Sequence, residues 1–255
     1  MQLLLLFFGT LWLISYISKR CDLALIRNGH SFLVYLSSMI GVPTHELSHY
    51  FFCKIFRHKV LKVRLFSPTP DGQLGFVEHS YNPASFYQKV GLFFIGIAPI
   101  IGGAIVIATV SRLMWPQVNF DQLAVNVLNN IETFGVLEGV GNYLLWSKEL
   151  HQYLFDASPT KYILWGIVML STLKHIFPSG ADMKGVILGL PTTIVIAVIS
   201  WMLAPELVET NSYMFLTYLF SILCSFGCIL LFFQLSMVLI STCIRKGFNQ
   251  CSNLQ

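Results

Sequence analysis

One short segment of the chain has the residue types and spacing of a metal-dependent hydrolase site. Residues 44 to 49 read Thr-His-Glu-Leu-Ser-His, which is an HExxH motif. On a helix, at about 100° per residue, His45 and His49 lie about 40° apart on neighbouring turns and can bind one Zn²⁺. Glu46 lies about 60° round the helix from His49, where it can accept a proton from a metal-bound water without being a ligand.

Chance does not readily produce this motif here. The chain has seven His, and its composition predicts an HExxH on the order of once in two hundred such chains. The motif also lies inside an apolar stretch, where three ionisable residues together cost several kcal/mol. The alternative, in which the His and Glu side chains only hydrogen-bond between helices, is therefore less favoured than metal binding.

A catalytic zinc needs a third protein ligand, and two carboxylates compete for this place. We predict Asp182, which follows the expected fourth span. His45 lies about fourteen residues into its span, hence about 21 Å deep, towards the same membrane face as Asp182. The rival is Glu138, in the sequence Glu-Gly-Val-Gly-Asn. The predicted topology places Glu138 on the opposite side, so it ranks second.

The composition predicts a membrane protein around this motif. Of 255 residues, 55% are hydrophobic and 11% are charged, and the mean hydropathy is +0.67. Soluble domains carry about a quarter charged residues. A disordered chain or a nucleic-acid-binding protein needs far more charge, so both classes are excluded. We expect an all-α polytopic membrane protein, with residues 1–255 forming a single transmembrane domain.

About six transmembrane helices are predicted from the apolar stretches. They cover residues 1–17, 31–56, 90–115, 162–177, 186–204 and 212–244. Lys and Arg are distributed ten to six between the two sides, which favours both termini in the cytoplasm. The expected location is a multi-pass integral protein of a cell inner membrane.

Two connections have structure of their own. Residues 59–80 alternate apolar and polar side chains around a Pro/Gly-rich turn, with Val60 breaking the alternation, so they predict a cytoplasmic β-hairpin on the same side as the metal. Asn82-Pro83 then fits a helix start. The external connection 116–160 has helical amphipathic spacing from Phe120 to Phe134, typical of an interfacial helix. A re-entrant segment or an extra span stays open.

Four features together resemble the site-2 protease family of intramembrane zinc metalloproteases. They are the HExxH span, the hairpin after it, a Gly/Pro-rich span over 90–115, and a late Pro178-x-x-x-Asp182-x-x-Gly185 segment. The resemblance covers residues 31–204. It implies that His45, His49 and Asp182 bind zinc and that Glu46 is the catalytic base.

The late segment departs from the family pattern at three points. His175 stands where the family has Asn, Met183 follows Asp182 where the family has Gly, and the gap is one residue shorter. The chain is therefore expected to be a distant member. His175 takes the place of a residue thought to support the transition state or the substrate backbone; a helix-capping histidine is the equal alternative.

The resulting expectation is a zinc metalloendopeptidase that cuts a peptide bond in or near a transmembrane segment of a membrane protein substrate. The bilayer is its other partner, a regulatory membrane partner is compatible with it, and no nucleic acid is expected. Two alternatives remain. One is a non-catalytic zinc-containing scaffold or complex subunit. The other is a membrane zinc peptidase of another class, with Glu138 as third ligand.

Overall fold

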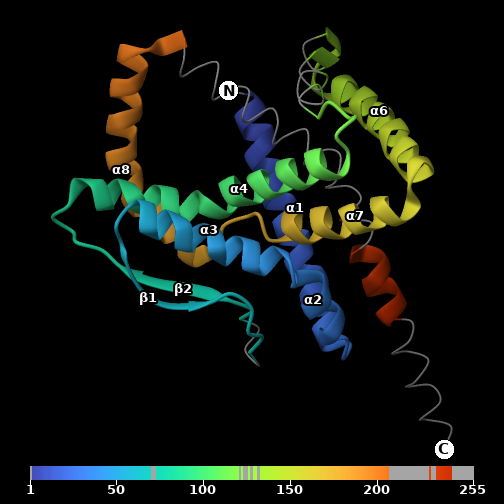
Figure 1. Cartoon of the computed structure of the whole chain (residues 1–255), viewed down its shortest axis with the longest axis horizontal. Coiled ribbons are helices and arrows are strands. Elements are labelled where there is room, and N and C mark those ends of the chain that lie inside the picture. Colours follow the sequence, from blue (N-terminus) through green and yellow to red (C-terminus); the bar gives the residue numbers. More distant parts are fainter. Residues whose placement is uncertain are drawn as a thin grey trace, which may run out of the picture.

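The computed structural model describes residues 2–69, 73–120, 122, 126, 129–130, 133–206, 230 and 234–242. Within these residues the chain is mostly helical and has one two-stranded antiparallel sheet (Figure 1). The elements are α1 (Gln2–Arg27), α2 (Ser31–Ser38), α3 (Gly41–Ile55), β1 (Lys59–Arg64), β2 (Phe76–Ser80), α4 (Phe86–Met114), α6 (Val136–Ala157), α7 (Pro159–Lys174) and α8 (Gly180–Leu203). The predicted mostly helical class is confirmed at this level.

Two helices are long and apolar enough to cross a membrane. They are α4, with 29 residues, and α8, with 24 residues; their most apolar 18-residue windows have mean hydropathies of 2.5 and 2.3. The two helices pack on each other. A Cβ at Gly96 would meet the carbonyl oxygen of Asp182, and a Cβ at Gly189 would meet the backbone of Phe93. Glycine therefore allows the two backbones to approach closely. The rest of α8 is largely exposed, since only 11% of its apolar window is buried.

The predicted continuous span over 31–56 is wrong, because the chain breaks into α2 and α3 at residues 39 and 40. The hydroxyl of Ser171, on α7, bridges the break. Its oxygen accepts a hydrogen bond from the backbone N–H of Gly41 (2.9 Å) and its O–H donates to the carbonyl of Ser37 (2.8 Å). A neighbouring helix thus satisfies backbone groups that a continuous helix would pair internally. The 21 Å depth assigned to His45 assumed that continuous helix and does not hold.

Several other boundaries differ from the predictions. Helix α1 runs on to Arg27, beyond the expected end at residue 17. Helix α4 begins at Phe86, where the Ser85 side chain accepts a hydrogen bond from Gln88, and not at Asn82-Pro83. Helix α8 begins at Gly180, six residues earlier than expected, so Asp182 lies in its first turn. Most of the expected last span, 212–244, lies outside the described residues, as does most of the amphipathic repeat over 120–134.

The predicted hairpin over 59–80 is confirmed. Strands β1 and β2 pair antiparallel, from Lys59 opposite Ser80 to Arg64 opposite Phe76. The register shifts between Val60 and Lys62, the position where the alternation of the sequence also breaks. Figure 1 shows the hairpin lying along α3, which it contacts through both strands. The hairpin therefore follows the HExxH helix and lies beside it.

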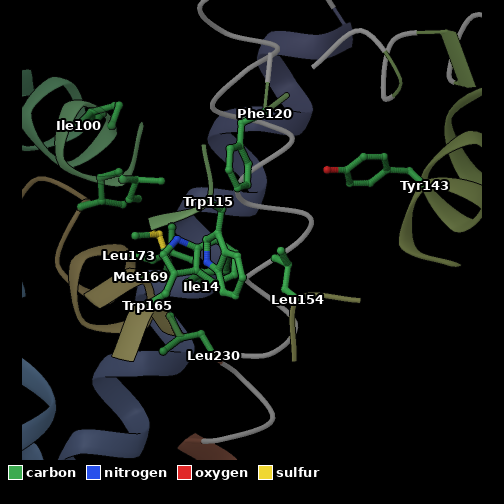
Figure 2. Packing of buried hydrophobic residues seen from close by; sticks show 13 residues of the cluster. Ile14, Ile100, Trp115, Phe120, Tyr143, Leu154, Trp165, Met169, Leu173 and Leu230 are labelled. Carbon is green, nitrogen blue, oxygen red and sulfur yellow. The ribbon is translucent and has the colours of Figure 1, made fainter. Parts of the chain in front are cut away.

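A cluster of buried apolar side chains fixes α7 against its neighbours (Figure 2). Trp115 and Trp165 pack edge to face, with ring centroids 6.3 Å apart, and the indole N–H of Trp165 donates to the hydroxyl of Ser111 on α4. The cluster comprises Ile14, Ile100, Ala104, Ile107, Trp115, Phe120, Tyr143, Leu154, Trp165, Met169, Leu173, Ile176 and Leu230. It ends at the connection between α7 and α8, which carries residues of the candidate site.

Candidate metal centre

The structure brings His45 and His49 of α3 together with Asp182 of α8, and their ligand atoms lie within 4.8 Å of one another. The two Nε2 atoms are 3.1 Å apart. One carboxylate oxygen of Asp182 is 3.4 Å from Nε2 of His45, and the other is 3.2 Å from Nε2 of His49. Tetrahedral ligands at about 2.0–2.1 Å from Zn²⁺ are themselves about 3.3–3.4 Å apart. Each imidazole nitrogen therefore lies near this separation from the other and from one oxygen of Asp182.

Backbone carbonyls fix the tautomer of both histidines. Nδ1 of His45 is 2.7 Å from the carbonyl oxygen of His175, and Nδ1 of His49 is 2.7 Å from the carbonyl oxygen of Ile95. A carbonyl only accepts, so each Nδ1 carries the proton and donates it. Each neutral ring then presents a bare Nε2 lone pair to the other ring and to Asp182. Such an arrangement is typical of metal-ligating histidine with its outer hydrogen bond.

The carbonyl of Ile95 is available to His49 because of a proline. In a regular helix this carbonyl would accept a hydrogen bond from the N–H of residue 99. Residue 99 is Pro99, which lies inside α4 and has no N–H. The freed carbonyl accepts the proton of His49 instead. The helix that packs against the HExxH helix thus supplies one of the contacts that orient the ligands.

Asp182 is oriented by a capping box at the start of α8. Its carboxylate accepts a hydrogen bond from the N–H of Ser179 (2.6 Å), and the Ser179 hydroxyl accepts one from the N–H of Asp182 (3.3 Å). The carboxylate therefore both caps the helix and points to the two histidines. The predicted spans 162–177 and 186–204 leave Asp182 in the connection between them; this placement is corrected, because α8 begins two residues before Asp182.

Glu46 is buried, with 8% of its surface exposed, and it lies beside the metal ligands without belonging to their group. Glu46 and His45 line one cavity of about 210 Å³. Gly75, just before β2, also lines this cavity, and a Cβ there would come within 2.9 Å of Cγ of Glu46. The residues just before β2 thus pack against the Glu46 side chain and form part of the wall of the adjoining cavity.

The side chains of the other two candidate residues do not belong to the group that can hold a metal ion. His175 is the C-cap of α7, and its ring Nε2 is 2.9 Å from the hydroxyl of Ser38, while its backbone carbonyl contacts His45. Glu138 is exposed in the first turn of α6. Among the described residues, the group that can hold a metal ion is His45, His49 and Asp182, without Glu138.

Sequence reasoning missed an ion pair beside the site, in which the lysine is buried and the aspartate partly buried. Lys174 lies in the last turn of α7 and contacts Asp22 of α1, and both line the same cavity as Glu46. A signal was present, since a lysine within a stretch predicted to span a membrane must find a partner. The partner itself could not be predicted, because the two residues are far apart in the sequence.

Comparisons of the chain with protein-family models, with curated proteins and with solved structures gave no match. The function is therefore inferred from the site itself.

Proposed function

We propose that the chain is a zinc-dependent endopeptidase that cuts membrane proteins in or near a transmembrane segment. The observation that carries the proposal is the convergence of three acceptors, Nε2 of His45, Nε2 of His49 and the Asp182 carboxylate, at 3.1–3.4 Å. Bare lone pairs at these distances repel one another unless a cation lies between them. Two imidazole nitrogens and one carboxylate suit Zn²⁺, with a fourth position open.

The chemistry of hydrolysis divides between the ion and Glu46. When bound, Zn²⁺ supplies a Lewis acid that polarises the scissile carbonyl and makes water more acidic. Glu46 adjoins His45 in sequence and lines the cavity, so its carboxylate takes the proton of the attacking water. The same carboxylate then delivers that proton to the nitrogen of the leaving amine. Burial of Glu46 keeps bulk water from competing for this proton.

The helices support a site within a bilayer. Helices α4 and α8 are long and apolar enough to cross a membrane, and each carries or contacts a ligand of the site. The HExxH helix packs on α4. We infer a multi-pass protein of a cell inner membrane with both termini cytoplasmic, and a substrate that reaches the metal from the lipid. The motif resemblance to site-2 proteases supports a distant member of that family.

Metal analysis of the full chain, purified in detergent, tests the ligand set. We expect one zinc per wild-type chain and loss of zinc in His45→Ala and Asp182→Ala. Glu138→Ala is the matched control and should keep its zinc, because Glu138 is exposed on α6. Zinc that survives His45→Ala, or that is lost in Glu138→Ala, would refute this ligand set.

Glu46→Gln tests catalysis separately from binding. Gln keeps the shape of the side chain but cannot act as a base, and loss of a general base lowers rates by about 10²–10⁴. We expect the variant to bind one zinc and to lose cleavage, measured by mass spectrometry of membrane-protein fragments in cells that express either form. Equal fragments from both forms, with zinc bound in both, would instead favour the non-catalytic scaffold.

A further inference from the structure

An ion pair between a buried lysine and a partly buried aspartate lies in the wall of the cavity next to Glu46. Nζ of Lys174 is 2.9 Å from a carboxylate oxygen of Asp22, and the lysine side chain is 3% exposed. The same ammonium donates to the hydroxyl of Ser37 (2.8 Å) and to the hydroxyl of Ser38 (3.3 Å). All three of its protons therefore have acceptors, and Lys174 has none left for a substrate. The lysine joins α7 to the polar face of α1 and to the end of α2.

The ion pair continues towards a metal ligand through Ser38. The Ser38 hydroxyl donates its own proton to the carbonyl of Val34 (2.7 Å). Its oxygen can then only accept, from Lys174 and from the ring of His175 at 2.9 Å. The His175 ring is thereby assigned its proton on Nε2. One serine thus holds both the lysine and the histidine that follows it in the chain.

His175 passes this constraint to the metal ligand through its backbone. Its carbonyl accepts the Nδ1 proton of His45 at 2.7 Å. Because Lys174 and His175 are consecutive, a shift of the lysine backbone moves the carbonyl that orients His45. Outer contacts of this kind change metal affinity by about 10–100-fold when they are removed.

We propose that Asp22, Lys174 and Ser38 are positioning residues that hold the His175 carbonyl against His45 and so set the affinity of the site for its metal. None of the three contacts the three metal ligands directly, and the pair also couples the position of α1 to the metal centre. The inference rests on the metal-binding part of the proposed function and is independent of peptide hydrolysis.

Breaking a buried ion pair on one side leaves an unpaired charge, and single variants therefore risk misfolding. The decisive variant replaces both partners by apolar side chains, Asp22→Leu with Lys174→Met. Such exchanges are often neutral or stabilising, so this double variant should fold. The double variant lacks the Lys174 ammonium that donates to Ser38, and so it no longer fixes Ser38 and His175. We therefore expect a less firmly oriented His45 in a protein whose helices still pack.

The experiment measures zinc affinity by chelator competition on the full chain in detergent, beside thermal unfolding of the metal-free protein. We expect the double variant to unfold at or above the wild-type temperature and to bind zinc about 10–100-fold more weakly. The visible spectrum of bound Co²⁺ should change as well. Ser38→Ala should lower zinc affinity to a similar extent. Asp22→Glu, which keeps the negative charge, should bind zinc with nearly wild-type affinity.

Lys161→Met is the matched control. Lys161 lies in the first turn of the same helix, with its ammonium 4.7 Å from the ring centre of Trp115, and it should leave zinc affinity unchanged. A folded double variant with wild-type zinc affinity and an unchanged Co²⁺ spectrum would overturn the inference alone. A wild-type chain that binds no zinc would overturn the proposed function, and the inference with it.

Discussion

The orientation of His49 depends on the absence of one backbone N–H in another helix. Pro99 removes the donor that would pair with the carbonyl of Ile95, and His49 donates to that carbonyl instead. Pro99 thus influences the site by leaving the carbonyl of Ile95 without a helical hydrogen-bond donor.

Pro99→Ala should therefore weaken metal binding. The new N–H would compete with His49 for the carbonyl of Ile95, and we expect zinc affinity to fall by about tenfold or more, as for other outer contacts of a metal ligand. Chelator competition measures the change. Pro191→Ala is the matched control, because Pro191 lies inside α8 and is exposed. Equal zinc affinity in wild type and Pro99→Ala would show that the freed carbonyl is not needed.

At the residue scale, the sequence predicts what local geometry determines. The spacing of His45 and His49 follows from helical periodicity, so the structure brings their Nε2 atoms together as expected. Asp182 was chosen through a depth argument that assumed an unbroken helix over 31–56, which is wrong. The better signal was local, since Ser179 and Asp182 have the spacing of a capping box. The contacts of Ser38 and Asp22 depend on tertiary packing and leave no local pattern.

Among the elements, the hairpin was predictable because alternation, turn residues and register all agree. The break between α2 and α3 was not, since both halves are apolar and the compensating hydroxyl comes from Ser171, far along the chain. The observed boundaries of α1 and α8 differ from the predicted ones, because the predictions ended helices near charged residues. Lys19 and Asp182 instead lie within the helices.

A pair of histidines at the base of the hairpin, His58 just before β1 and His79 on β2, makes the anchoring of the hairpin depend on pH. Nε2 of His58 donates to the carbonyl of Gln88 (2.8 Å), so its bare Nδ1 accepts the proton of His79 Nδ1 (3.0 Å). Burial lowers the pKa of His58. Burial, and then the charge of His58, lower the pKa of His79 to about 4. A proton added to His58 would go to Nδ1 and oppose the Nδ1–H of His79, whereas a proton added to His79 would go to Nε2 and put a buried positive charge beside His58.

Stability should therefore fall as the pH drops from about 6.5 towards about 4. In this range the unfolded chain binds protons that the folded hairpin does not, so acid favours unfolding, whereas above about 6.5 the full stability is present. Thermal unfolding at pH 7.5 and 5.0 measures the effect. Each kcal/mol shifts the melting temperature of a chain of this size by about 2–4 °C. His79→Gln should reduce the difference between the two pH values; an unchanged difference would contradict the assignment.

For the whole molecule, the contact between α4 and α8 determines where Asp182 lies. Gly96 and Gly189 let the two backbones meet, and the first turn of α8 then delivers the carboxylate to α3. The close packing of two apolar helices follows from their glycine content. Which carboxylate reaches the histidines follows from the register of that packing, which the sequence alone does not determine.

Gly189→Ala should therefore affect both stability and the site. The added Cβ would meet the backbone of Phe93, and overpacking of this kind costs about 1–3 kcal/mol. We expect a lower melting temperature together with weaker zinc binding, because α8 must shift. Gly166→Ala is the control, since a Cβ at Gly166 on α7 meets no atom within 4 Å among the described residues. Similar effects of both variants would argue against the packing explanation.

The exposed face of α8 has a consequence for how the protein responds to its lipid environment. Only 11% of its apolar window is buried, so in a bilayer most of this helix would touch acyl chains. A helix in that position adjusts its tilt when the hydrocarbon layer is thinner or thicker than its own apolar length. Because Asp182 lies in its first turn, such a tilt would move one ligand relative to two that stay on α3. Zinc affinity should then vary between nanodiscs of short-chain and long-chain lipids, and an affinity that is the same in both would show that α4 holds α8 firmly enough to isolate the metal from membrane thickness.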